Sequence, residues 1–111
     1  MGYFINIPLF SLGKLLISEE VKTLNYDYTL LLKRHQFGDF GSVDAHHVIE
    51  NNRAIELGED VLSEYEILVD GRELHVVIMT ESDRSYTVVF ILDKNKLKFS
   101  DGGNSQNLDC F

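Results

Sequence analysis

Several residue types are scarce in this 111-residue sequence, and each shortage excludes a class of protein. The single cysteine, Cys110, allows neither an intramolecular disulfide nor a cysteine-rich zinc site, which suits a reducing compartment. The N-terminal segment lacks the positive charge of a signal peptide, and charged residues interrupt its apolar run well short of a membrane span. We therefore expect a cytoplasmic protein without a membrane partner.

Positive charge is scarce as well, with 10 Lys and Arg against 18 Asp and Glu and a formal net charge of -8. Surfaces that bind nucleic acids are usually rich in Lys and Arg, so no direct nucleic-acid partner is expected. The sequence also has no HExxH motif, no paired CxxC motifs and no glycine-rich phosphate loop that leads into a helix. We expect neither a metal nor another cofactor.

A hydrophobic content of 44% and a single proline indicate one folded unit. We expect a single α+β domain over residues 1–99 and a flexible C-terminal tail over 100–111. In the first half of the chain, helical spacing and capping residues predict three helices after a short strand. The strand covers residues 12–17, and the helices cover about 19–25, the stretch from Asp27 to before Gly38, and 45–57.

The third predicted helix is the longest, with Asp44 as its N-terminal cap and Gly58 as its stop. The stripe expected to face the core consists of Ala45, Val48, Asn52 and Ile55, with Ile49 beside it. Asn51 or Asn52 on an inner face would need hydrogen-bond partners. We expect such a partner in the turn at residues 38–41, which would hold the two segments in register.

The second half of the chain has the period of two that is typical of strands. Asp70-Gly71 is a strong signal for a hairpin turn. The predicted strands are residues 61–69, 74–80 and 86–92, with 96–99 as a further edge strand. The expected fold class is therefore α+β, with N-terminal helices packed on a three- to four-stranded antiparallel sheet.

Two polar clusters are candidates for a functional site, one around His35 and the other at residues 81–85. A histidine that exchanges a proton near neutral pH, beside carboxylates and an arginine, would suit acid/base hydrolysis. The catalytic residues would then be His35, Asp39, Glu81, Asp83 and Arg84. The residues of a binding site would be Arg34, His35, Asp39, Phe40, Asn51, Tyr65, Glu81, Asp83 and Arg84. The alternative is structural, because carboxylates also satisfy turn amides and pair with arginines to hold loops.

Several of these blocks resemble a family of small proteins carried by bacterial plasmids, prophages and integrative elements. The family pattern has RHQxGDWG and TEADRS motifs, with an Asp, an Asn and a Ser-x-Tyr strand between them. The corresponding residues here are RHQFGDFG at 34–41, Asp44, Asn51, Ser63-Glu64-Tyr65 and TESDRSYT at 80–87. Phe40 stands where the family has Trp. The resemblance implies a common fold and a role in the conflict between mobile elements and host defences.

Three functions follow from these observations, and we favour the first. The first is binding to a host protein through an acidic face and inhibition of a nucleic-acid-binding defence protein, such as a restriction or CRISPR component. The acids available to build this face are Glu19, Glu20, Glu59, Asp60, Glu64 and Glu66. Alternatively, the chain is a structural or oligomerising module. The third possible function is that of a small hydrolase or nuclease that uses His35, Asp39, Glu81 and Asp83. The sequence leaves the oligomeric state open.

Overall fold

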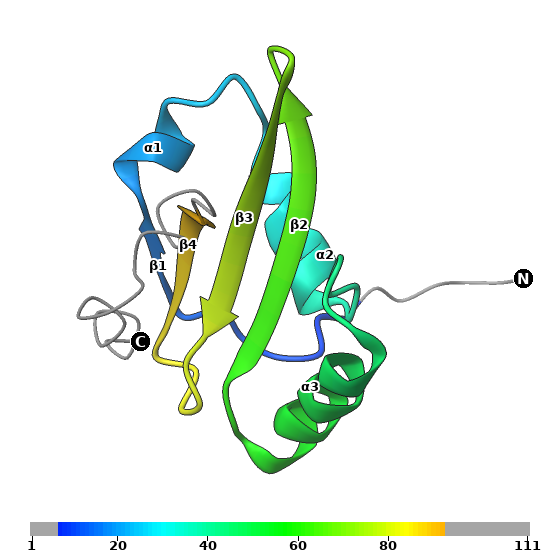
Figure 1. The fold of residues 1–111 in the computed structure, drawn as a ribbon. Helices are drawn as coiled ribbons and strands as arrows, with labels where there is room; N and C mark the ends of the chain where they lie inside the picture. The colour runs from blue at the N-terminus through cyan, green and yellow to red at the C-terminus, as the bar shows by residue number, and fades with distance from the viewer. Residues whose placement is uncertain (1–6, 93–111) are drawn as a thin grey trace, which may run out of the picture.

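The computed structural model describes residues 7–92 as helices on a four-stranded sheet (Figure 1). The elements in chain order are β1 (Lys14–Ile17), α1 (Glu19–Lys22), α2 (Thr29–Gln36), α3 (Ala45–Leu57), β2 (Val61–Val69), β3 (Arg72–Thr80) and β4 (Tyr86–Leu92). The order of the strands across the sheet is β1-β4-β3-β2. The fold is α+β, as expected.

The sheet is mixed rather than antiparallel, which corrects the sequence-based expectation. Hairpin connections make β2, β3 and β4 antiparallel neighbours, but β1 pairs with β4 in parallel, from Lys14 opposite Tyr86 to Ile17 opposite Val89. Three helices and two strands separate β1 from β4 in the chain, so no tight turn fixes their relative direction. In chain order, the three helices therefore follow β1 and precede the other three strands, rather than preceding all of the strands.

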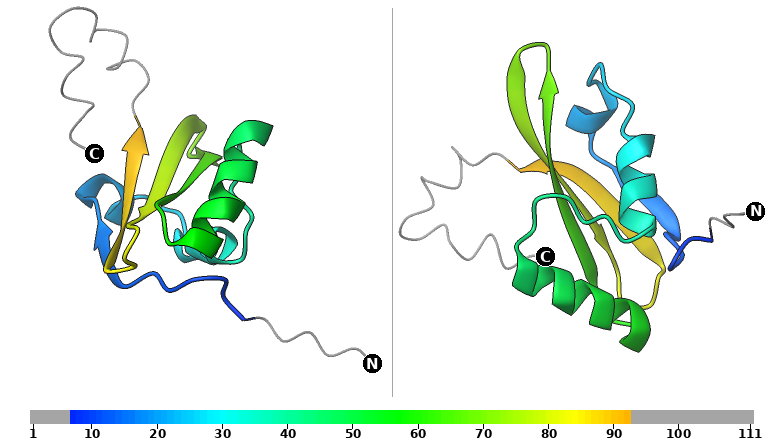
Figure 2. Two further views of the ribbon diagram at one scale, coloured as in Figure 1. Left: turned by 90° about the horizontal axis from the view of Figure 1, so that it is seen from below. Right: turned by 90° about the vertical axis from the view of Figure 1, so that its right-hand side faces the viewer.

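The main core lies between one face of the sheet and the two short helices. Figure 2 shows α1 and α2 together on this face, while α3 lies beside β2. Val21 of α1 and Leu31 and Leu32 of α2 pack against buried residues of β2, β3 and β4. A second cluster joins α3 to the segment before β1 and to the start of β2, and consists of Phe10, Phe40, Ala54 and Val61. Two cores thus hold the helices to a single sheet.

The helix ends match the capping residues in part. Asp44 accepts a hydrogen bond from the backbone N–H of His47 at 2.8 Å, and Gly58 ends α3 with a φ of 73°. Helix α1 is shorter than expected, because it ends at Lys22. Asp27 accepts from the Thr29 N–H at 3.1 Å, but the helix cap is one residue later than expected, at Tyr28.

The predicted buried stripe of α3 is correct in part, because Val48 and Ile55 are partly buried against the second core cluster. Asn51 and Ala54 are the buried residues of this helix, whereas Asn52 is exposed and Ile49 is 67% exposed. The helix packs on the second core cluster through Ala54, with Val48 and Ile55 partly buried beside it, and Asn51 is buried as well. Hydrophobic periodicity therefore identifies only part of the contact face of α3.

The strand predictions hold for β2, β3 and β4. Residues of β2 alternate between buried and more exposed, with Val61, Ser63 and Tyr65 inward. The hairpin turn between β2 and β3 has positive φ at Asp70 (50°) and Gly71 (79°), which matches the right-handed twist of the two strands. The expected strand at 96–99 and the tail at 100–111 lie outside the described residues.

The turn at residues 38–41 runs into a segment that lies directly against β2. Ser42 donates its backbone N–H to the Glu64 carbonyl at 2.6 Å, and Glu64 donates to the Phe40 carbonyl at 3.1 Å. Gly41 has a φ of 75°, and a Cβ there would overlap the Glu64 carbonyl oxygen and lie 2.6 Å from the Tyr65 ring. Glycine is therefore required at this position both by conformation and by space.

Gly41→Ala should destabilise the protein by about 3 kcal/mol or more, because the methyl group adds a clash to the left-handed strain. Gly58→Ala is the matched control: its φ is 73°, but a Cβ there has nothing within 4 Å. This control should cost only about 1 kcal/mol. Chemical denaturation of both variants tests the difference, and equal losses would contradict the close packing of Gly41 on β2.

Candidate functional site

His35, the central residue of the predicted site, is completely buried on α2. Its Nδ1 atom lies 2.6 Å from Ser63 Oγ on β2, and its Nε2 atom lies 2.9 Å from Thr80 Oγ1 on β3. The edge of the ring contacts Phe10, with 5.1 Å between the two ring centroids. Both ring nitrogens therefore have protein partners, and neither faces solvent.

The hydrogen bonds of His35 continue through two threonines to the backbone before β1. Thr87 Oγ1 donates to the Leu12 carbonyl at 2.7 Å, so its only proton is used there. In the 2.7 Å bond between the two hydroxyls, Thr80 must then be the donor to Thr87. His35 must in turn donate from Nε2 to Thr80, which leaves Nδ1 to accept from Ser63. The chain of donors selects one neutral tautomer of His35.

Electrostatics also favour the neutral form of His35. Burial, followed by the positive charge of Arg84, lowers the pKa of His35 to about 3. The imidazole is therefore uncharged at neutral pH and is isolated from bulk water. Catalysis by His35 would require this part of the core to open.

Asp39 and Arg34 form an ion pair on the surface beside the 38–41 turn. Arg34 donates from Nε to Asp39 Oδ2 at 2.8 Å and from Nη2 to Oδ1 at 3.3 Å. The hydrogen bond from Arg34 holds the pKa of Asp39 below its usual range. The Arg34 guanidinium lies 4.7 Å from the centroid of the Tyr65 ring, and the Tyr65 hydroxyl donates to the Asp39 carbonyl. These three side chains fasten the turn to α2 and β2.

Arg84 donates its hydrogen bonds to backbone carbonyl groups rather than to a carboxylate. It donates to the carbonyls of Ala54 at 3.0 Å, Glu59 at 2.7 Å and Glu81 at 3.1 Å. Its guanidinium also lies 5.3 Å from the centroid of the Phe10 ring. Arg84 thus ties the C-terminal end of α3 to the β3–β4 turn, where a positive charge suits the negative end of the helix dipole.

The other members of the predicted clusters lie around these contacts. Asp83 accepts from the Ser85 N–H at 2.9 Å, and hydrogen bonds from Ser85 lower the pKa of Asp83. Glu81 stands at the end of β3, where its N–H donates to the Tyr86 carbonyl at 3.0 Å. Phe40 is buried in the second core cluster. Of the 81–85 cluster, only Arg84 is thus brought near His35, since both contact the Phe10 ring. Glu81 and Asp83 form their hydrogen bonds within their own turn.

Asn51 is the buried polar residue of α3, and it contacts β2 rather than the 38–41 turn as predicted. Its amide nitrogen donates to the Leu62 carbonyl at 2.7 Å, and its amide oxygen accepts from the Leu62 N–H at 3.1 Å. β2 is an edge strand, so the outward backbone groups of Leu62 have no neighbouring strand within the described sheet. Asn51 replaces the missing strand at this residue.

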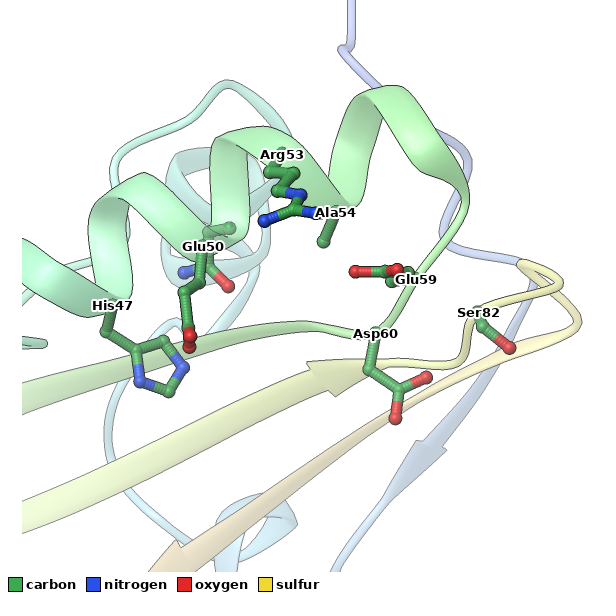
Figure 3. Close-up of a pocket in the computed structure, with 8 residues that line it drawn as sticks. His47, Glu50, Arg53, Ala54, Glu59, Asp60 and Ser82 are labelled. Atoms are coloured by element: carbon green, nitrogen blue, oxygen red, sulfur yellow. The ribbon is translucent and has the colours of Figure 1, made fainter.

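A pocket that the sequence analysis did not identify lies between α3 and the ends of two strands (Figure 3). Its volume is about 570 Å³, and its lining residues are His47, Glu50, Asn51, Arg53, Ala54, Glu59, Asp60 and Ser82. Among the described residues, Glu59 and Asp60 form no ion pair. The adjacent acids that follow the Gly58 helix stop were the signal in the sequence. Only Asn51 is shared with the predicted site.

Two further features are absent from residues 7–92. This part of the chain contains no group of three or more His, Cys, Asp or Glu side chains placed to hold a metal ion. None of its helices has the length and apolar character needed to cross a membrane.

The buried His35 predicts a specific pH dependence of stability. The folded pKa of about 3 lies below the unfolded value of about 6.5, so the His35 contribution is complete above pH 6.5 and declines as the pH falls toward 3. Between pH 7 and pH 5, the difference in unfolding free energy between wild type and His35→Gln should shrink by about 2 kcal/mol. Urea denaturation at both pH values measures this, and a constant difference would show that His35 titrates alike in both states.

Asn51→Ala should destabilise the protein by about 2 to 4 kcal/mol, since it leaves the outward backbone groups of Leu62 without partners. Asn52→Ala is the matched control on the same helix, where the exposed side chain can be removed with a change of about 0.5 kcal/mol or less. Thermal or chemical unfolding compares the two. Similar losses in both variants would contradict the role given to Asn51.

Comparisons with known proteins give no assignment: no protein-family model, no curated protein and no solved structure matches this chain. The function is therefore argued from the geometry and charge of the chain itself.

Proposed function

We propose that the chain is a small mobile-element protein that binds a host protein with a basic surface. Its favoured partner is a nucleic-acid-binding defence protein, such as a restriction or CRISPR component, which it would inhibit. The uneven distribution of charge along the fold carries this proposal. The resemblance to proteins of plasmids and prophages motivates the choice of a defence protein.

Negative charge is concentrated in one continuous part of the chain, from the cap of α3 to the start of β3. Residues 44–73 contain nine acids and two arginines, whereas residues 7–36 contain three acids and four Lys or Arg. The nine acids are Asp44, Glu50, Glu56, Glu59, Asp60, Glu64, Glu66, Asp70 and Glu73. All except Glu64 are exposed. We call this region the acidic surface.

The acidic surface lies at one side of the molecule. It comprises α3, β2 and the hairpin turn, which follow one another along the β2 edge of the sheet, while β1 forms the opposite edge (Figure 1). The pocket with Glu50, Glu59 and Asp60 opens within it. Grouped carboxylates can occupy a basic groove that otherwise binds nucleic-acid phosphates, and they also speed the encounter with such a groove.

The burial of His35 weighs against the hydrolase interpretation. General acid/base catalysis needs a group within hydrogen-bond reach of the substrate, or one water away from it. His35 has no exposed surface, and its two nitrogens already bond to Ser63 and Thr80. A binding function needs no such opening of the core.

The proposal is tested by neutralising two carboxylates at the pocket with Glu59→Gln/Asp60→Asn. The matched control, Glu19→Gln/Glu20→Gln, removes the same charge from exposed positions on α1. Tagged full-length protein is used to capture proteins from host lysate at about 0.1 M and about 0.5 M salt, with quantification by mass spectrometry. If each lost carboxylate removes about 0.5 kcal/mol, the first variant should recover about fivefold less of a basic partner at low salt.

The control variant should recover the partner as well as wild type does, and high salt should reduce recovery by all three proteins. Equal recovery by the two variants, or recovery that does not respond to salt, would contradict binding through the acidic surface. Recovery of nothing above the level of an unrelated tagged protein would do the same.

A further inference from the structure

We propose that two copies of this chain associate through the outer edges of their β1 strands, which joins the two four-stranded sheets into one. This inference concerns the edge opposite to the acidic surface and does not depend on the function proposed above. The occupant of the β1 edge is thus a second copy of the same chain.

The backbone of β1 leaves hydrogen-bonding groups on its outer side. Lys14 donates its N–H to the Ser85 carbonyl at 3.0 Å, and Ser18 donates to the Val89 carbonyl at 3.0 Å. Alternate residues of a strand point their N–H and C=O groups in opposite directions, so those of Leu15 and Ile17 point away from β4. In the sheet formed by the described residues β1 is an edge strand, and these groups are placed to pair with another strand.

Exposed apolar side chains also lie on β1. Leu15 and Leu16 are each 43% exposed, on opposite faces of the strand. A shallow groove of about 390 Å³ follows the strand and is lined by residues 15–18, by Lys22 of α1 and by residues 88–90 of β4. Added strands gain affinity from main-chain hydrogen bonds and from contacts of alternate side chains, and this edge offers both.

An antiparallel pairing of two β1 strands satisfies all of these groups at once. Leu15 lies opposite Ile17 of the second copy and Ile17 lies opposite its Leu15, so that both pairs exchange hydrogen bonds. The two Leu16 residues then face each other at the symmetry axis. A twofold interface is self-complementary in this way, because each contact occurs twice.

Charge favours a second copy at this edge in spite of the net charge of -8. Residues 7–36, which include β1, carry four Lys or Arg against three acids, and the acidic surface lies at the far edge of each sheet. Pairing through β1 therefore keeps the two acidic surfaces apart. In the antiparallel register Lys14 lies opposite Ser18 of the second copy, next to the exposed carboxylates that begin its α1 helix. Opposite charges thus meet at both ends of the interface.

The size of the contact sets the expected affinity. β1 has four residues, so the paired strands bury a small area, in the range that is typical of weak and transient complexes. We therefore expect a reversible dimer that forms at concentrations of about 10 to 100 µM.

The experiment is sedimentation velocity on the full chain between about 5 and 500 µM, which spans the expected midpoint. The average mass of wild type should rise from 12.7 kDa toward twice that value. Leu16→Lys places two like charges at the symmetry axis and should weaken dimerisation by about tenfold or more. Leu68→Lys is the matched control, because Leu68 is an exposed strand residue, 66% accessible, on β2 at the far edge. It adds the same charge and should dimerise like wild type.

Circular dichroism is used to check that both variants fold. Amide hydrogen exchange provides a second measurement of the interface. In wild type, exchange at Leu15 and Ile17 should slow as the concentration rises, while exchange at the tip of the β2–β3 hairpin should not. A mass of 12.7 kDa throughout the concentration range would overturn the proposal. Equal dimerisation by Leu16→Lys and Leu68→Lys would also overturn it, since the interface would then lie elsewhere.

Discussion

A buried chain of hydrogen bonds through His35 is the constraint on which the fold depends. It starts at Ser63 on β2, passes through His35 on α2 and the threonines that end β3 and begin β4, and reaches the Leu12 carbonyl before β1. One connected set of side chains therefore joins β2, β3 and β4 to α2 and to the segment before β1. Because every donor in it has one acceptor, a break at any point leaves a buried polar group unpaired, which costs more than the bond itself contributes.

The structural role of His35 agrees with the contacts of the other polar residues, which also connect elements of the fold. Arg34, Asp39 and Tyr65 hold a turn against β2, and Arg84 joins the end of α3 to the β3–β4 turn through backbone carbonyls. Residue types that suit an acid/base site thus connect separate elements of the fold. The acidic surface and the nearly neutral β1 strand lie at opposite edges of one sheet. We propose the first as the site for a basic partner and the second as the site for a further copy of the chain.

Local features of the sequence predicted most of the fold. The strands 61–69 and 86–92 and the turn at Asp70-Gly71 were found because period and turn chemistry act between near neighbours. The parallel pairing of β1 was missed, because it joins segments about 70 residues apart. The contact face of α3 is predicted only in part, because Asn51, a polar residue, bonds to the backbone of an edge strand. The pocket depends on the placement of α3 beside the β3–β4 turn, so periodicity could not reveal it.

His35 acts as a neutral, structural residue, and the nitrogen chemical shifts of its imidazole report its protonation state. Spectra of the full chain, recorded from pH 8 down to pH 5, should show a proton on Nε2, an unprotonated Nδ1 and no change over this range. Titration of His35 near pH 6.5, or a proton on Nδ1 at neutral pH, would contradict the account and return His35 to the candidates for catalysis.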